Sequence, residues 1–110
     1  MKRSVLVAMV CAAPLAGVAH AQSPDYMQED CAVAAQGFFQ VFDAETETKY
    51  EGQRTDGTHA VNGTIALETG GEDFQCSYNA AGDAMVDFYA EGKSWTDFAQ
   101  TGEGSPHFKN

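Results

Sequence analysis

The sequence predicts an α+β domain in which one N-terminal helix packs on an antiparallel meander of four strands, with a disulfide from the helix to the sheet. Three observations support this prediction. Apolar residues recur at helical spacing near the start of the mature chain and alternate with polar residues from residue 46 onward. Two cysteines remain once an N-terminal export signal is removed.

Residues 1–21 have the features of a secretory signal peptide. Two basic residues precede an uncharged apolar run from Val5 to Val18, which is shorter than the roughly 20 residues that a membrane-spanning helix needs. The run ends in Ala-His-Ala at 19–21, a typical cleavage signal, so we expect the mature chain to begin at Gln22. No later segment is long and apolar enough for membrane insertion, and the sequence predicts a periplasmic or secreted protein.

The helix is expected to begin at residues 23–25, where a hydroxyl N-cap, a proline and a carboxylate follow one another. Its apolar face is formed by Met27, Cys31, Ala34 or Ala35, and Phe38. Its end is open between Gly37 and Phe42, because Phe38–Phe42 also fits a buried strand.

Four strands follow, and they are expected at Thr46–Arg54, Thr58–Glu68, Phe74–Asn79 and Ala84–Ala90. Asp56-Gly57 is a hairpin signal, Thr69–Glu72 is expected to be a loop, and Gly82 supplies a left-handed residue in the last hairpin. Gly63, inside the second strand, indicates a bulge or a close approach of another group.

The cysteines predict one disulfide. Cys11 leaves with the signal peptide, and Cys31 and Cys76 both fall on predicted buried faces of an exported chain, where pairing is the simplest interpretation. Two unpaired thiols, or half of a metal site, is the alternative.

The C-terminal part is expected to end the domain, which we place at residues 22–98. Trp95 and Phe98 fit one helical turn over a sheet edge, while the remainder is rich in Gly, Ser, Pro and charge. Residues 99–110 are therefore predicted to form a flexible tail.

The residues that carry this layout are the segment Cys31-Ala32-Val33-Ala34-Ala35 at the helix, Phe74-Gln75-Cys76 in the third strand, and Gly82 before the last strand. The layout resembles that of small exported, periplasmic domains of Gram-negative bacteria, a group without an established activity. The resemblance implies the fold and assigns no functional role to any residue.

Charge excludes two classes of partner. Loss of Lys2 and Arg3 with the signal peptide leaves four basic residues against sixteen acidic ones, a formal net charge of −12. Such a chain lacks the basic surface that nucleic acids or anionic lipids require. The same acidity also maintains the solubility of an exported protein, or of one from a salty habitat, without any partner.

Motifs for catalysis, zinc, calcium or thiol redox chemistry are missing, so no cofactor or metal is predicted. His59 lies on a predicted strand and His107 in the predicted tail. A small hydrolase-type enzyme that uses His59 with carboxylates is therefore an alternative, and an accessory domain without a discrete ligand is another.

The favoured hypothesis is a non-enzymatic, inhibitor-like binding protein for a cationic exported partner, of no specified oligomeric state. The expected contact residues are acidic and lie on the polar first strand and in the loops beside it: Asp43, Glu45, Glu47, Glu51, Glu68, Glu72 and Asp73.

Overall fold

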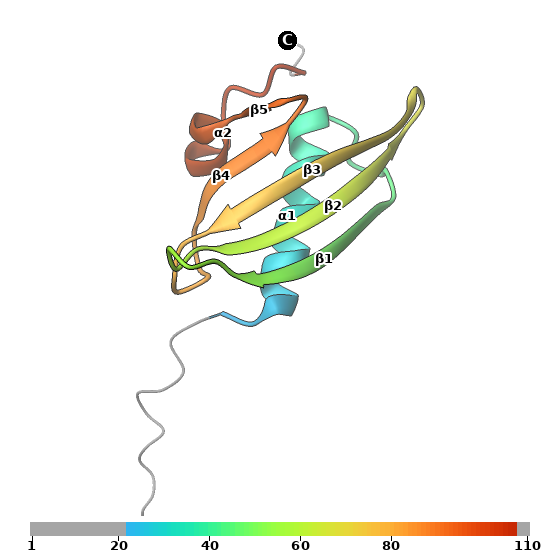
Figure 1. Cartoon of the computed structure of the whole chain (residues 1–110). Helices are drawn as coiled ribbons and strands as arrows, with labels where there is room; N and C mark the ends of the chain where they lie inside the picture. The colour runs from blue at the N-terminus through green and yellow to red at the C-terminus, as the bar shows by residue number, and fades with distance from the viewer. Residues whose placement is uncertain (1–21, 108–110) are drawn as a thin grey trace, which may run out of the picture.

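The structure, a computed structural model, describes residues 22–107 as two helices and one sheet (Figure 1). The elements are α1 (Pro24–Phe39), β1 (Thr46–Gln53), β2 (His59–Leu67), β3 (Gly70–Tyr78), β4 (Met85–Ala90), β5 (Lys93–Ser94) and α2 (Thr96–Thr101). The α+β class and the antiparallel meander are confirmed. The predicted signal peptide at 1–21 lies outside the described residues.

Helix α1 begins as expected and ends between the two positions that the sequence left open. The Ser23 side chain accepts a hydrogen bond of 3.1 Å from the Tyr26 N–H, and Pro24 opens the first turn. The helix passes through Gly37 and stops after Phe39, where Gln40 adopts a left-handed conformation with φ of 61°. The segment around Phe42 is therefore neither helix nor strand.

The prediction of four strands was wrong, because β5 adds a fifth. Lys93 and Ser94 pair with Ala90 and Tyr89 across a turn in which Glu91 and Gly92 both have positive φ. A strand of two residues is too short to show alternation, so its sequence carried no period-2 signal.

The predicted loop at Thr69–Glu72 was also wrong. Leu67 pairs with Gly70, so the turn contains only Glu68 and Thr69, and Gly70 to Glu72 already belong to β3. Two adjacent glycines are typical of a loop, but Gly70 and Gly71 pair here with Leu67 and Ala66, and Gly70 has a positive φ of 124° that glycine readily adopts.

Gly63 marks a close approach and not a bulge. Its pairing with Thr48 and Phe74 is continuous on both sides. A methyl group at Gly63 would overlap the Phe74 ring and come within 2.9 Å of the Glu47 carbonyl oxygen, so the ring occupies the space that a side chain would need. The register shifts lie elsewhere, between Tyr50 and Gly52 of β1 and between Ser77 and Tyr78 of β3.

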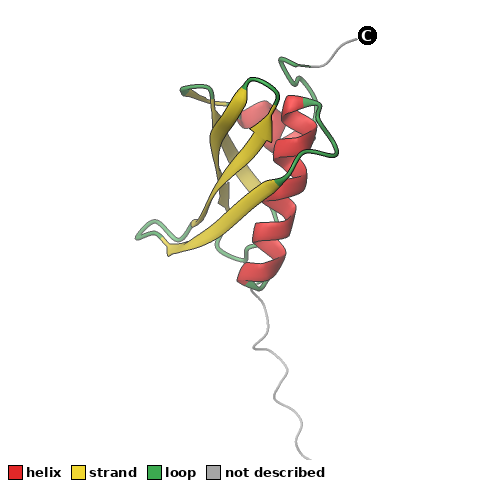
Figure 2. Cartoon of the chain, turned by 90° about the vertical axis from the view of Figure 1, so that its right-hand side faces the viewer, coloured by secondary structure: helices red, strands yellow, loops and turns green. Residues whose placement is uncertain are grey.

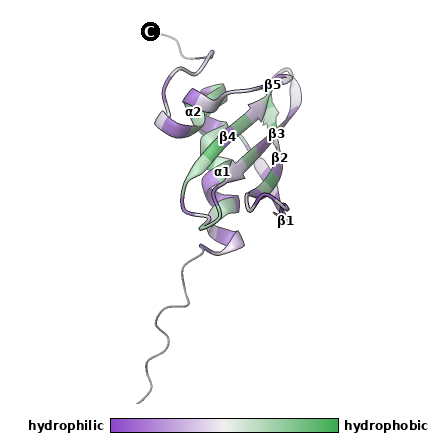
Figure 3. Ribbon diagram, turned by 60° about the vertical axis from the view of Figure 1, so that its left-hand side comes forward, coloured by the Kyte–Doolittle hydropathy of each residue, from purple (hydrophilic) through white to green (hydrophobic). Residues whose placement is uncertain are grey.

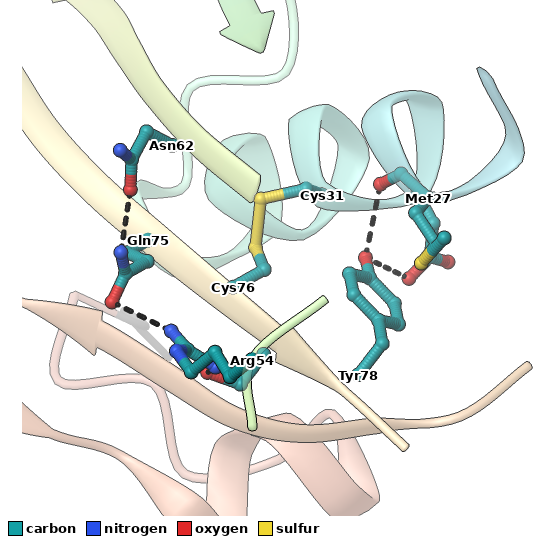
Figure 4. Close-up of a disulfide and its surroundings, with 9 residues drawn as sticks. Met27, Cys31, Arg54, Asn62, Gln75, Cys76 and Tyr78 are labelled. Atoms are coloured by element: carbon teal, nitrogen blue, oxygen red, sulfur yellow. Dashed lines mark hydrogen bonds between the residues drawn. A yellow bond between two sulfur atoms is a disulfide. The ribbon is translucent and has the colours of Figure 1, made fainter. Parts of the chain in front are cut away.

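Helix α1 covers one face of the sheet, and the core lies between the two layers (Figure 2). The Cys31–Cys76 disulfide crosses this core from α1 to β3, with a Cα–Cα distance of 5.9 Å, as the sequence predicted (Figure 4). Among the fully buried side chains of the described chain, the largest are Met27, Phe38, Val61, Ile65, Tyr78 and Phe88.

Helix α2 packs beside β4, which carries hydrophobic residues in Figure 3. It buries Phe98 as expected and continues to Thr101, past residue 98, at which the sequence analysis ended the domain. The following segment returns to α1: Ser105 Oγ donates a hydrogen bond to the Phe38 carbonyl, and the His107 ring lies 5.1 Å from the Phe39 ring. Flexibility of residues 99–110 stays a prediction.

Tyr78 joins the sheet to α1 through its hydroxyl group. The side chain is fully buried, and its oxygen lies 2.7 Å from Asp30 Oδ2 and 3.1 Å from the Met27 carbonyl oxygen (Figure 4). Burial, followed by the Asp30 carboxylate, raises the pKa of Tyr78 well above its ordinary value.

This raised pKa predicts a loss of stability in alkaline solution. A tyrosine in the unfolded chain ionises at about pH 10, whereas Tyr78 in the folded protein keeps its proton there. The contribution of its hydroxyl group to the free energy of unfolding is therefore complete below that pH and decreases as the pH rises above it. We expect the free energy of unfolding, measured with urea at several alkaline pH values, to decrease less with pH in Tyr78→Phe than in the wild type. Tyr89→Phe, which alters a half-exposed ring, is the control and should follow the wild type. An unchanged pH dependence in Tyr78→Phe would contradict this assignment.

Candidate functional site

The face of β1–β4 opposite α1, here called the uncovered face, carries no helix of the described chain (Figures 1 and 2). It is hollowed into an open depression of about 850 Å³. Strand alternation directs polar side chains into this depression, in contrast to the apolar side that meets the helix. The outward residues are Glu47, Lys49, Asn62, Thr64, Asp73, Gln75 and Tyr89.

Register places these side chains in two rows across the sheet. One row runs Lys49, Asn62, Gln75 and Tyr89 from β1 to β4. In the other row Thr64 stands between Glu47 and Asp73. Two carboxylates from different strands therefore flank one hydroxyl group in the depression.

Arg54 ties the polar groups at one end of the uncovered face together. Its guanidinium group donates to Thr58 Oγ1 at 3.0 Å, Ser77 Oγ at 3.1 Å and Gln75 Oε1 at 3.3 Å. Gln75 Nε2 in turn donates to Asn62 Oδ1 at 2.6 Å (Figure 4). These bonds hold the side chains of Asn62 and Gln75 in place, and they direct the Arg54 guanidinium group toward partners within the protein.

The predicted acidic contact residues do not form one cluster. Glu47, Glu51 and Asp73 border the depression, all three exposed. Glu72 also borders it, but its partner across the strands is the buried Ile65, so its side chain belongs to the face that carries α1.

The remaining acids of the predicted set lie at the margins of the sheet. Asp43 and Glu45 are exposed in the segment before β1, and Glu68 is exposed in the β2–β3 turn. The structure thus brings three of the seven predicted residues onto one face and distributes the others around it.

Four residues of the uncovered face were not predicted as site residues from the sequence: Lys49, Asn62, Gln75 and Tyr89. The signal was present, because each is the outward member of an alternating strand pattern. Selecting residues by negative charge alone excluded the lysine, the two amides and the tyrosine, although Tyr89 is 45% exposed.

His59 is a buried residue with both ring nitrogens engaged. It is 7% exposed, Nδ1 lies 2.7 Å from the Tyr50 hydroxyl oxygen, and Nε2 lies 2.9 Å from the Ala80 carbonyl oxygen. A carbonyl can only accept, so Nε2 donates to Ala80, and in the neutral ring Nδ1 then accepts from the Tyr50 hydroxyl. Neither ring nitrogen is hydrogen-bonded to a carboxylate, the group that the enzyme alternative combines with His59, so these two contacts do not support that alternative.

Within residues 22–107, no three His, Cys, Asp or Glu side chains gather closely enough to hold a metal ion.

Neither of the two helices described is long and apolar enough to cross a membrane.

No protein-family model, curated protein or solved structure matches the chain. The resemblance to exported domains of Gram-negative bacteria therefore stays a prediction.

Proposed function

We propose that the protein is an exported, non-catalytic binding protein that recognises a positively charged protein partner with the uncovered face of its sheet. The observation that carries this proposal is the open depression bordered by Glu47, Glu51 and Asp73. A partner can reach it without any rearrangement of the core, because these carboxylates are exposed on strands β1 and β3.

The charge of the whole chain supports the same function. Sixteen acidic residues create a negative field that raises the local concentration of a basic partner and accelerates encounter. The exposed carboxylates of the depression then select the partner by complementarity, while the fixed amides and Tyr89 offer hydrogen-bonding and ring contacts.

Association kinetics with a basic cell-wall hydrolase test this proposal. The association rate should decrease as salt is added, since charges are screened over about 10 Å at 0.1 M ionic strength. Glu47→Lys combined with Asp73→Lys should slow association further and leave the melting temperature nearly unchanged, because both positions are exposed.

The matched control reverses two charges on the opposite side of the molecule. Asp25→Lys with Glu29→Lys changes the net charge equally, and both residues are exposed on α1. It should slow association less than the double reversal in the depression. Two results would contradict the proposal: no association at low salt, or an association rate that changes neither with salt nor with the charge-reversal substitutions. Either result would leave solubility as the sole role of the acidic surface.

A further inference from the structure

The outer edge of β1 offers a second element of recognition. β1 is the first strand in the sheet order and has a neighbour on one side only (Figure 1). An edge strand presents alternate backbone N–H and C=O groups that another extended chain can pair with.

Two hydrogen bonds establish which groups of β1 point outward. The Tyr50 N–H donates a hydrogen bond of 3.0 Å to Gln28 Oε1 of α1 and not to β2, so the Tyr50 backbone faces away from the sheet. The Glu45 carbonyl accepts from the Ala66 N–H at 2.9 Å and thus faces β2. Alternation between these two points directs the backbone N–H and C=O groups of Thr46 and Thr48 outward.

Helix α1 and the register shift in β1 limit the edge to its first half. Gln28 takes the place of a strand partner at Tyr50, and the irregularity between Tyr50 and Gly52 interrupts the ladder immediately beyond. The stretch Thr46–Lys49 precedes both features and lies away from α1 in Figure 1. It therefore offers two residues, and four backbone groups, for pairing.

Side chains along this stretch indicate the chemistry of the partner. A residue directly opposite Glu47 in an added strand would lie about 5 Å from it on the uncovered face. A Lys or Arg there would pair with the Glu47 carboxylate, with Glu45 nearby along the chain. Residues opposite Thr46 and Thr48 would meet threonine side chains, which suit small or β-branched residues.

A second copy of this chain suits the edge less well. If two β1 strands pair antiparallel with Glu47 at the centre, Glu47 of one copy lies opposite Glu47 of the other. If Thr46 is at the centre, Glu47 lies opposite Glu45. Like charges directly opposite each other are unfavourable in both registers. In the register that places Glu47 opposite Lys49, the Tyr50 N–H would have to donate to the other copy. That N–H already donates to Gln28 Oε1.

We propose that a basic, extended segment of the partner adds to β1 as a further strand, paired with the outward backbone of Thr46 and Thr48. This inference rests on the proposed function and specifies how the cationic partner binds. Its basic side chains lie beside Glu47 on the uncovered face, and its alternate residues lie beside the two threonines.

The test uses a short acetylated peptide in which Lys alternates with Thr, in three forms: unmodified, N-methylated at every Lys, and N-methylated at every Thr. In the added strand the Lys side chains share the face of Glu47, so the Thr residues direct their N–H groups toward β1. Methylation at Thr should weaken binding about tenfold or more, whereas methylation at Lys should leave it nearly unchanged. Titration calorimetry measures both affinities.

Amide hydrogen exchange of the protein supplies an independent measurement. The Thr46 and Thr48 amides should exchange more slowly with the unmodified peptide bound, while the Glu47 amide, which already faces β2, should change little. Equal binding of all three peptides would overturn edge pairing and leave the proposed function intact. Failure of every peptide and of the basic hydrolase at low salt would contradict both. A dimer of the protein alone, with Thr46 and Thr48 protected, would assign the edge to a second copy.

Discussion

Replacement of both cysteines, Cys31→Ala with Cys76→Ala, is expected to lower the free energy of unfolding by about 4 kcal/mol. The bridge spans 45 residues of sequence, so its loss restores much conformational entropy to the unfolded chain. A domain of this size has a total stability of roughly 5–15 kcal/mol, so the expected loss is a large part of it. Urea unfolding at neutral pH measures the change.

Chemical reduction of the wild type is the control for this variant. Both sulfur atoms are fully buried, so a part of any loss in the variant comes from altered packing, which reduction leaves nearly intact. Reduction should reproduce most of the destabilisation. A melting temperature that is the same before and after reduction would show that the bridge contributes little to stability.

The fold could be predicted from the sequence wherever a local pattern and a chemical constraint agreed. Residues 23–25 combine three helix-start preferences, and the structure places the N-cap there. The disulfide was predicted because two cysteines remain in an exported chain, and helical spacing at Cys31 and alternation at Cys76 independently directed both sulfur atoms into the core.

Prediction failed where tertiary contacts override local preference. Gly70 and Gly71 form part of a strand because β2 supplies the hydrogen-bonded partner, which residue type alone does not reveal. The end of α1 is fixed by the left-handed Gln40, a conformation that is uncommon for residues other than glycine. No pattern in the sequence marks it.

The candidate site was predicted by composition and corrected by geometry. Acidic residues were grouped by their proximity along the chain, yet Glu72 and Asp73 are adjacent in sequence and point to opposite faces of β3. Conversely, Glu47 and Asp73 are far apart in sequence and share a face with Thr64 between them. Strand pairing decides which charges lie together, and local patterns in the sequence do not fix the register of that pairing.

Phe38→Ala is expected to destabilise the domain by about 3–5 kcal/mol, as for other truncations of a large buried aromatic side chain. Phe38 is 0% exposed, and its ring centroid lies 4.9 Å from that of Phe88, 5.2 Å from that of Phe98 and 5.3 Å from that of Trp95. It therefore joins α1 to β4 and α2, and its removal leaves a cavity at the point where these three elements meet.

Phe42→Ala provides the matched control, because it also truncates a phenylalanine to alanine. Both residues belong to Phe38–Phe42, the segment that the sequence left open between helix and strand. Phe42 is 66% exposed, so its truncation should change the free energy of unfolding by no more than about 0.5 kcal/mol. Urea unfolding of the two variants and the wild type compares them directly. If Phe38–Phe42 were instead a buried strand, Phe38, Gln40 and Phe42 would share one face, and both truncations would be costly. Similar losses in the two variants would thus contradict a helix that ends at Phe39.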